Sequence, residues 1–373
     1  MKLLCVIDCL GSGGAQRQLV NIGRGLKERG HIVEFFAYYP GDHFKTQLDQ
    51  AGIPVRLDVK ASKFSLRPAL ALRRLIRCGD FTSVLAFLET PAVYAELACL
   101  GLRRVRLVVG ERSTVPDGPA SVSRVLKSHL HRLSHAVVAN SRTQRTWLST
   151  KFPFLESKLH CIWNGVDTNT FHPPQEADSS GELRLLGIGR VAVEKNLPRL
   201  ASALRRCRDQ GLSVTLDWVG RIEDNCYHSM IFGMVKDRGL ATSWRWLGER
   251  RNVPDLMRQY DALISPSLWE GLPNVVCEAL ASGLPVLASD VSDNALLVQD
   301  ERSGFLFSAN DVSGMATAIM RFAQLEREER AAMGRVGRAF ALRELSLESC
   351  LDSYEILLSP TEVAERTQQS QLS

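Results

Sequence analysis

The sequence predicts an α/β protein with two facing, doubly wound Rossmann-like domains and a cleft between them. Short apolar runs alternate with amphipathic stretches along most of the chain, which is typical of a parallel sheet covered by helices on both faces. The alternation stops at a polar, proline-containing stretch near residues 172–181 and then starts again. A length of 373 residues is also large for a single core and favours two domains.

These patterns divide the chain into five parts. Residues 1–172 form the first domain, residues 173–181 a linker and residues 182–345 the second domain. Residues 346–358 form a terminal helix that could cross back to the first domain. Residues 359–373 are polar, and we expect this tail to be disordered.

The elements of the first domain follow its apolar runs in order. We expect strands at residues 3–9, 32–38, 55–59, 83–88, 106–111 and 136–140. We expect helices at residues 15–30, 44–51, 67–77, 122–133 and 143–152. A glycine-rich turn at residues 11–15 joins the first strand to the first helix.

The second domain repeats the same order of elements. We expect strands at residues 183–188, 214–219, 244–247, 262–265, 286–288 and 304–307. We expect helices at residues 197–210, 227–238, 253–260, 312–325 and 329–342. One further helix begins at Pro273 or Asn274 and ends at Gly283, since proline is favoured in a first helical turn and glycine just beyond the last.

Composition excludes several classes of protein. The nine cysteines are scattered without a C-x-x-C pair, which argues against a disulfide framework and fits a reducing cytoplasm. The apolar stretch at residues 85–102 contains two glutamates and a proline, so we expect no transmembrane helix. The apolar start is read as a first strand rather than a targeting segment. We therefore expect a cytoplasmic protein.

Charge is distributed unevenly between the two halves. Residues 1–172 carry 24 Lys+Arg and 13 Asp+Glu, hence 24 − 13 = +11, and the remainder carries 22 − 28 = −6. The basic half could face anionic lipid, a phosphorylated acceptor or nucleic acid, or it could be a solvated surface. Residues 63–77 are basic and amphipathic, so they could lie on an anionic membrane or pack against the core with arginines outside.

The stretch at residues 265–280 holds two carboxylates of different character. Glu270 lies in a loop, whereas Glu278 lies in the following helix among apolar neighbours. A buried carboxylate needs a partner, and the first turn of this helix offers N–H groups to an anion. The two glutamates could form a hydrolytic acid/base pair or the two sides of a ligand site.

Two cations follow the first strand of the second domain. Arg190 and Lys195 lie at its carboxyl edge, where they could neutralise a diphosphate; a surface loop with a Glu194–Lys195 pair is the alternative. In the first domain, Gly13 and Gly14 let backbone N–H groups approach a ligand. The spacing is not G-x-G-x-x-G, which disfavours a dinucleotide site.

Together these residues resemble the family-4 (group 1) retaining glycosyltransferases of the GT-B fold. The two glutamates with seven intervening residues are the signature of that family. The other matching segments are residues 13–15, 164–167, 189–190, 194–196, 266–274 and 283–286. The resemblance covers nearly the whole chain.

The resemblance implies a nucleotide-sugar donor, with a UDP-sugar favoured, and no metal or other cofactor. Arg190 and Lys195 would hold the diphosphate, Glu278 the ribose and Glu270 the donor sugar, so Arg190, Lys195 and Glu270 would carry catalysis. The implied donor-binding set is Gly13, Gly14, Arg190, Lys195, Trp246, Leu247, Glu270, Gly271, Leu272, Pro273, Asn274, Val275 and Glu278. The acceptor would be a saccharide or lipid-linked saccharide, with an anionic membrane surface as a further partner and no nucleic acid.

One departure from the family concerns the end of the fifth strand. The family often has a histidine there, against the donor sugar, but this chain has Glu111 and Arg112. Either could contact a sugar or the acceptor, as could Asn164. His129, His131 and His135 are expected on the surface of a helix rather than in a metal site. An epimerase or hydrolase of the same fold and a non-catalytic nucleotide-sugar-binding module are the alternative functions.

Overall fold

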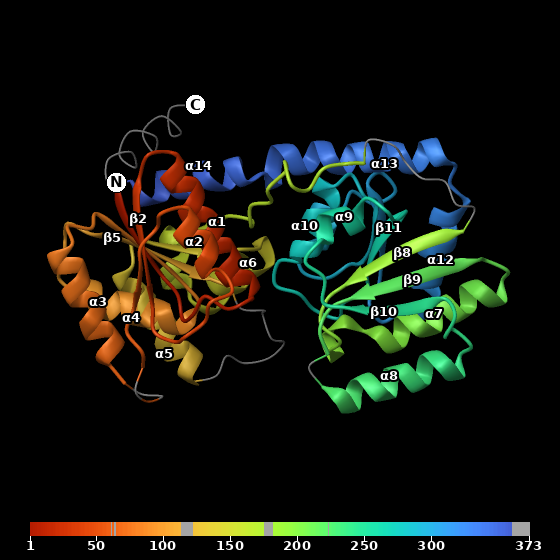
Figure 1. The fold of residues 1–373 in the computed structure, drawn as a ribbon, viewed down its shortest axis with the longest axis horizontal. Coiled ribbons are helices and arrows are strands. Elements are labelled where there is room, and N and C mark those ends of the chain that lie inside the picture. The colour runs from red at the N-terminus through yellow and green to blue at the C-terminus, as the bar shows by residue number, and fades with distance from the viewer. Residues whose placement is uncertain (61, 63–64, 113–121, 175–181, 223, 360–373) are drawn as a thin grey trace. The chain divides into compact units, whose positions relative to one another are not determined.

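The computed structural model describes all residues except 61, 63–64, 113–121, 175–181, 223 and 360–373. The chain forms two compact units (Figure 1). The first domain comprises Met1–Gly165 and the segment that begins at Leu347, and the second comprises Val166–Ser346. The division after Gly165 precedes the predicted one after residue 172. Most of the predicted linker and nearly all of the predicted tail lie outside the described residues.

The first domain is built on a sheet of seven parallel strands in the order β3-β2-β1-β4-β5-β6-β7. The strands are β1 (Lys2–Val6), β2 (Ile32–Ala37), β3 (Val55–Leu57), β4 (Ser83–Phe87), β5 (Arg106–Glu111), β6 (Ala136–Ala139) and β7 (Leu159–Cys161). The helices are α1 (Gly14–Glu28), α2 (Lys45–Gln50), α3 (Arg67–Cys78), α4 (Glu89–Cys99), α5 (Val122–Leu130), α6 (Arg142–Lys151) and α14 (Leu347–Leu358). Helices α1, α2 and α14 share one buried cluster with the sheet, and α3, α4 and α6 share the other.

Two elements of this domain were not predicted. Helix α4 is buried on several sides and therefore lacks the polar stripe that marks an amphipathic helix. Strand β7 has only three residues. The end predicted for the helix at 122–133 was wrong. Helix α5 stops at Leu130, and the 3-10 helix His131–Leu133 follows it.

Helix α14 lies along α1 although the two are far apart in sequence (Figure 1). A Cβ atom at Gly25 of α1 would lie 2.4 Å from Leu351, so only glycine permits this approach. Arg29 forms ion pairs with Glu348, Asp352 and Glu355 at 2.7, 2.8 and 2.8 Å. The last helix thus completes the core of the first domain.

The second domain has a six-stranded parallel sheet in the order β10-β9-β8-β11-β12-β13. The strands are β8 (Leu183–Ile188), β9 (Val214–Val219), β10 (Trp244–Gly248), β11 (Ala262–Ser265), β12 (Val286–Ser289) and β13 (Gly304–Phe307). The helices are α7 (Leu197–Asp209), α8 (Asn225–Asp237), α9 (Val253–Met257), α10 (Asn274–Ala281), α11 (Asn294–Leu297), α12 (Val312–Gln324) and α13 (Arg327–Phe340). Helix α9 is shorter than predicted, and the four-residue α11 was not predicted.

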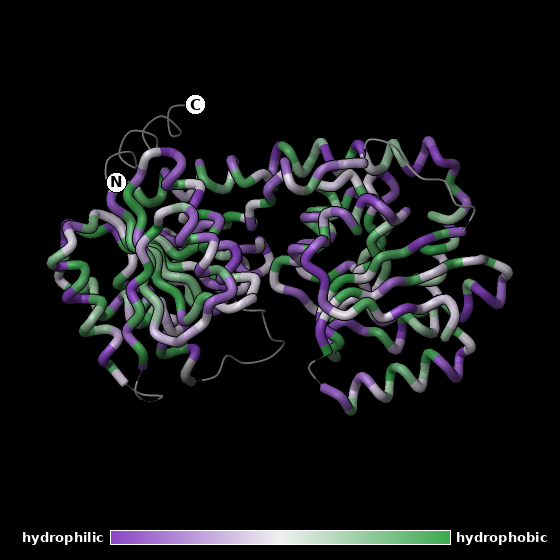
Figure 2. Tube along the Cα trace, viewed as in Figure 1, coloured by the Kyte–Doolittle hydropathy of each residue, from purple (hydrophilic) through white to green (hydrophobic). Residues whose placement is uncertain are grey.

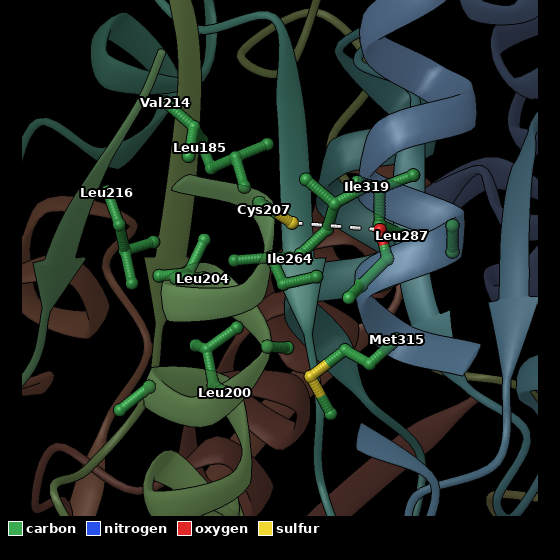
Figure 3. Packing of buried hydrophobic residues seen from close by; sticks show 14 of the residues in the cluster. Leu185, Leu200, Leu204, Cys207, Val214, Leu216, Ile264, Leu287, Met315 and Ile319 are labelled. Atoms are coloured by element: carbon green, nitrogen blue, oxygen red, sulfur yellow. Dashed lines mark hydrogen bonds between the residues drawn. The ribbon is translucent and has the colours of Figure 1, made fainter. Parts of the chain in front are cut away.

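Helices cover both faces of this sheet. Figure 1 shows α7 and α8 on one side of the strands and α9, α10 and α13 on the other. In Figure 3, side chains of α7 and α12 interdigitate over β8 and β11, and the thiol of Cys207 donates to the carbonyl oxygen of Ala316 at 3.6 Å. Figure 2 shows apolar strands inside each domain and polar stretches on its outer helices. This distribution is that of two separate hydrophobic cores.

The strand order reverses beside the first strand of each sheet. The reversal lies between β1 and β4 in the first domain and between β8 and β11 in the second. In doubly wound sheets, ligands bind beyond the carboxyl ends of the strands at this switch point. Among the described helices, none has both the length and the apolar character needed to cross a membrane.

Candidate functional site

In the second domain, the loops after β8 and β11 flank the switch point and hold the predicted charged residues. The ammonium group of Lys195 donates to Glu270 Oε1 at 2.6 Å, and the Ser267 hydroxyl donates to the same oxygen at 2.6 Å. The structure thus brings together two residues that lie 75 positions apart. Within the described part of the chain, Glu270 Oε2 accepts no hydrogen bond, so it can accept one from a ligand hydroxyl.

The loop that carries Glu270 is pinned along its length. The Asn196 amide donates to the Pro266 carbonyl at 3.0 Å, and Leu268 N–H donates to the Glu194 carbonyl at 2.8 Å. The Ser289 hydroxyl donates to the Ser267 carbonyl at 2.6 Å, and the Ser292 hydroxyl donates to the Gly271 carbonyl. These contacts fix the carboxylate before any ligand arrives, which is how a binding site avoids an ordering cost.

Asn196 connects three loops at once. Its backbone is left-handed (φ 55°), a conformation that asparagine tolerates better than most residues. Its side-chain amide donates to the carbonyl oxygens of Pro266 and Ala309 at 3.0 and 2.7 Å. Asn196 therefore holds the loops after β8, β11 and β13 in one arrangement.

Arg190 lies at the exposed end of the same site. It pairs with Glu194 at 2.6 Å, and Lys195 pairs with Glu270, so the alternative of a Glu194–Lys195 surface pair was wrong. A Cβ atom at Gly189 would meet the Lys195 side chain at 2.8 Å, so the glycine leaves room for the lysine to lie across it. Two cations consequently border the carboxyl end of β8.

Helix α10 begins at Asn274 with Pro273 as its N-cap, as predicted. Its backbone bonding starts at Val276, whose N–H donates to the Pro273 carbonyl at 3.0 Å. Val275 N–H precedes this bond and has no acceptor among the described residues, so it can serve an anion. Glu278 follows on the second turn and is only 5% exposed. Glu278 is thus buried, as the sequence predicted.

The predicted base-contacting residues lie on the edge strand β10. Trp246 packs against Trp244 and His228, with ring centroids 5.2 and 5.5 Å apart, and Leu247 is half-buried. The structure therefore gives Trp246 a packing role within the domain. A contact of Trp246 or Leu247 with a base stays a prediction.

In the first domain, Gly13 and Gly14 lie where the glycine loop enters α1. Gly13 is the N-cap of α1, no side chain caps the helix at this residue, and the first turn carries no acidic residue. A Cβ atom at Gly13 would lie 2.1 Å from the Gln16 amide oxygen. The Gln16 side chain thus lies beside this helix start, and contact of Gly13 or Gly14 with a ligand stays a prediction.

Glu111 ends β5 and belongs to a buried charge cluster. The imidazole of His131 lies between Glu96 Oε1 (2.6 Å from Nδ1) and Glu111 Oε1 (3.1 Å from Nε2). Burial alone would lower the pKa of His131, but the two carboxylates outweigh it and raise the pKa to about 10. The prediction that His131 lies on a helix surface was wrong, because these partners draw it into the core.

The pKa values of the two carboxylates in this cluster are shifted in opposite directions. Burial alone would raise the pKa of Glu111, but His131 and then Arg124 reverse the effect, so the pKa is lowered. Burial raises the pKa of Glu96, and His131 offsets this only in part. Glu111 is therefore a fixed anion at the carboxyl edge of the sheet.

Arg112 is committed to a different set of partners. Its guanidinium donates to Asn164 Oδ1 at 2.5 Å and to the Tyr354 hydroxyl, and it lies 3.9 Å from the centre of the Phe87 ring. The structure thus brings Arg112 and Asn164 together and separates both from Glu111's partners. These contacts tie α14 to the end of β5, and contact of any of the three with a sugar stays a prediction.

The three histidines do not form a metal centre. His129 Nδ1 contacts the Val125 carbonyl and His135 Nδ1 accepts from Leu107 N–H, so each ring has its own partner. Within the described ranges there is no group of three or more His, Cys, Asp or Glu residues suited to a metal ion.

The fold and the charged loops at its ligand edge define a two-domain α/β protein with charged side chains held at the switch point of its second sheet. Residues 12–170 match the profile of Glycosyltransferase Family 4, and residues 182–324 match that of Glycosyl transferases group 1. The putative glycosyltransferase EpsF of Bacillus subtilis is 30% identical over 307 residues, which cover 78% of this chain and 79% of EpsF. The chain therefore belongs to the family-4, group 1 glycosyltransferases, as its motifs predicted.

Two further relatives bear on the fold and the substrates. The UDP-Gal:alpha-D-GlcNAc-diphosphoundecaprenol alpha-1,3-galactosyltransferase of Escherichia coli is 30% identical over 176 residues, 44% of this chain and 45% of that enzyme. The chain thus spans about half of the length of this relative. The crystal structure of Anabaena Alr3699/HepE in complex with UDP and glucose has a TM-score of 0.83 at 22% identity, over 95% of this chain and 98% of HepE. This likeness confirms the GT-B fold.

Sequence reasoning missed the residues that hold the site in place. Ser267 was noticed as part of a motif, whereas Ser289 and Ser292 belong to none, and only the folded loops show what the three hydroxyls bind. Asn196 was noticed as part of a motif, but not as the link between loops. An asparagine just before a helix that starts with Leu-Pro could have signalled a left-handed position.

Proposed function

We propose that the protein is a retaining glycosyltransferase that moves a sugar from a nucleotide-sugar to a saccharide or lipid-linked acceptor. The observation that carries this proposal is the Lys195–Glu270 pair at the switch point of the second sheet, beside the start of α10. It offers positive charge for a diphosphate and a carboxylate for sugar hydroxyls. A UDP-sugar is the favoured donor, since HepE was solved with UDP and glucose.

Donor binding would use the second domain as follows. Lys195 uses one of its three donors on Glu270, which leaves two for a diphosphate, and Arg190 adds charge from the exposed side. Glu278 would take the ribose hydroxyls, because a buried carboxylate is stabilised by hydroxyl donors. Glu270 Oε2 and the backbone after Gly271 would hold the donor sugar.

Bond cleavage would depend on stabilising the departing diphosphate. The bond between the anomeric carbon and the diphosphate oxygen breaks, and the electron pair leaves with that oxygen. Lys195, Arg190 and the N–H groups at the start of α10 neutralise the charge that develops there, so the residues present can supply this role without a metal. The acceptor hydroxyl oxygen attacks from the face that the diphosphate leaves, which retains the configuration, and the hydroxyl proton passes to the departing diphosphate oxygen.

The pathway is proposed from the relatives' substrates. The Escherichia coli relative acts on a diphosphoundecaprenol-linked sugar. We place the present protein in cell-surface polysaccharide or glycolipid biosynthesis on this basis. Its first domain, with residues at the carboxyl edge of β1 to β5, would take the acceptor.

The test combines binding with turnover. UDP-, GDP- and ADP-sugars are screened for their effect on the melting temperature, because a ligand of the native state raises it. The stabilising donor is then incubated with and without lipid-linked saccharides. Transfer with retained anomeric configuration, seen by NMR and unaffected by EDTA, supports the proposal. Turnover of the donor without acceptor indicates an epimerase or hydrolase, and binding without any turnover indicates a binding module.

Peripheral attachment to the cytoplasmic face of a membrane is proposed from α3. Leu66 and Leu70 are 60% and 68% exposed there, and Arg74 and Arg77 are exposed beside them. Leucines with flanking arginines suit an anionic lipid surface. Co-sedimentation with vesicles should require anionic lipid, weaken with salt and fall in a Leu70→Ser/Arg74→Ser variant. Binding that ignores lipid charge and salt contradicts this proposal.

A further inference from the structure

A lysine surrounded by tyrosines lies in the first domain, and the charged loops described above do not include it. The Lys60 ammonium nitrogen is 5.7, 5.9 and 5.1 Å from the ring centres of Tyr38, Tyr39 and Tyr94. The Tyr38 ring lies 5.1 Å from Tyr39 and 5.2 Å from Tyr94, centre to centre. We call these four residues the tyrosine–lysine cluster. Attraction between a cation and aromatic faces holds such a group together.

The cluster is assembled at the ligand edge of the first sheet. Tyr38 and Tyr39 follow the carboxyl end of β2, Lys60 follows that of β3, and Tyr94 lies on the helix after β4. This is the edge beside the β1/β4 switch point, where doubly wound sheets bind ligands.

Backbone and side-chain hydrogen bonds fix the cluster. The N–H groups of Tyr38 and Tyr39 both donate to the Asp8 carbonyl, at 3.1 and 2.8 Å. Lys60 N–H donates to the Tyr38 carbonyl at 2.9 Å, and the Tyr94 hydroxyl donates to the Ser65 carbonyl at 2.9 Å. Chain segments after four strands therefore hold the rings and the ammonium group in one place.

The ammonium group of Lys60 forms no ion pair with any described residue. Among the described residues, no carboxylate oxygen lies within 4.0 Å of its ammonium nitrogen. Burial, followed by the Asp8 charge, raises the pKa of Tyr38, so its hydroxyl stays neutral and does not supply the missing anion. A half-buried cation held among rings gains stability when a ligand brings a negative group to it.

One ring of the cluster is available to a ligand. Tyr39 is 42% exposed, whereas Tyr38 and Tyr94 are 1% and 5% exposed. The rings of Tyr38 and Tyr94 are therefore buried beneath the surface, and the Tyr39 ring is partly exposed to solvent. The apolar C–H face of a pyranose packs well on such a ring, while the hydroxyls remain in water.

We propose that the tyrosine–lysine cluster is the acceptor subsite and that it takes a saccharide bearing a phosphate or diphosphate. The saccharide ring stacks on Tyr39, and the Lys60 ammonium group donates to the phosphate oxygens. This inference rests on the proposed glycosyltransferase function. It goes further, because it names the anionic group of the acceptor and the residues that bind it. The phosphate separates this acceptor class from neutral polysaccharide ends.

The test measures binding rather than turnover. The first probe is N-acetylglucosaminyl diphosphate carried on a soluble phenoxyundecyl tail, and the second is the same glycoside without the diphosphate. Both are titrated by calorimetry into the full chain with saturating UDP, so that cations of the second domain are occupied. We expect Lys60→Met to weaken the diphosphate probe roughly tenfold, because a charge-assisted contact is lost, and to leave the neutral probe unchanged.

Matched variants separate charge from stacking. Tyr39→Ala should weaken both probes by a similar factor, and Tyr39→Phe should restore them, since the ring and not the hydroxyl is used. Lys45→Met removes an exposed lysine that already pairs with Asp49 at 2.9 Å, and it should change neither affinity. Circular dichroism and melting curves establish that each variant is folded.

Two results would overturn the inference. If the wild type and folded Lys60→Met bind the diphosphate probe with equal affinity, Lys60 does not contact the phosphate. A loss with Lys45→Met as large as that with Lys60→Met shows only a general charge effect. Failure of the glycosyltransferase proposal is seen separately, as absence of transfer from every donor in the screen described above, and it leaves the probe comparison interpretable.

Discussion

The two domains share one strand order around their first strands, yet they build their ligand edges differently. In the second domain, Lys195 and Glu270 come from two loops that begin at known motifs, and both side chains remain partly exposed. In the first domain, His131 is buried between two carboxylates, and Lys60 is held among three rings. The second edge is a partly exposed ion pair that a ligand can reach, whereas the first contains a buried group of charges.

This difference indicates a division of labour. An accessible pair of opposite charges suits a substrate that brings a diphosphate and hydroxyls, because Lys195 keeps two donors and Glu270 keeps Oε2, which can exchange water for the ligand. Buried charges cannot exchange partners without a large desolvation cost, so we expect the His131 cluster to keep its charge state. Four predictions follow from treating one edge as exchangeable and the other as fixed.

The largest effect is expected at the exchangeable edge. Lys195→Ala removes the cation nearest Glu270 and should lower the transfer rate by about a hundredfold or more, because charge on the leaving group is no longer stabilised. Initial rates of UDP release with donor and acceptor measure it. Lys236→Ala, an exposed lysine on α8, is the control and should be fully active. A folded Lys195→Ala enzyme of normal rate would contradict the assignment.

The second largest effect is expected on the free energy of unfolding, and it comes from the buried Glu96–His131–Glu111 cluster of the first domain. His131→Gln leaves Glu96 and Glu111 close together in the core without the imidazolium between them. We expect a loss of about 3–5 kcal/mol in the free energy of unfolding at pH 7, the usual cost of breaking a buried charge network. Urea denaturation measures the loss, and a Glu96→Gln/His131→Gln double variant should recover part of it. A loss below 1 kcal/mol would show that the cluster is not charged.

The pH dependence of this loss has a definite direction. The pKa of His131 is raised from 6.5 to about 10 by folding, so its contribution is complete below pH 6.5 and disappears as pH rises towards 10. The difference in unfolding free energy between the wild type and His131→Gln should therefore shrink between pH 7 and pH 10. Glu96, Glu111, Arg124 and Lys127 surround this group and are retained in both proteins. A constant difference across that range would mean that His131 is not the titrating group.

A smaller effect is expected at Asn196, which positions the exchangeable edge without contacting substrate. Asn196→Gly keeps the left-handed backbone but loses both amide hydrogen bonds, so we expect about 1–3 kcal/mol of destabilisation. Asn196→Ala should be worse, because alanine is strained at φ 55°. Chemical denaturation ranks the variants, and donor KM reports on the Glu270 loop. Equal stability of Asn196→Ala and the wild type would show that the loops are held by other contacts.

The sequence predicted the ligand edge of the second domain better than that of the first domain, and the reason is physical. Glu270, α10 and Glu278 are neighbours along the chain, so their spacing encodes their geometry directly. The parallel strands and most helices were also readable, because apolar periodicity reflects burial on one face.

The first edge could not be read in this way. His131 meets Glu96 and Glu111, which lie 35 and 20 residues away, and Lys60 meets rings from two other segments. Such contacts depend on tertiary packing and leave no local pattern. Helix α4 was missed for the same reason, since burial on several sides erased its amphipathic period.

The most direct test of the account compares one lysine from each edge in UDP binding. Calorimetry should show that Lys195→Ala weakens UDP binding about tenfold or more, since one charge-assisted contact to the diphosphate is lost. Lys60→Met should bind UDP as tightly as the wild type, because the Lys60 charge is proposed to bind the acceptor and not UDP. Unchanged UDP affinity in Lys195→Ala, with a loss in Lys60→Met, would reverse the roles assigned to the two domains and contradict the account.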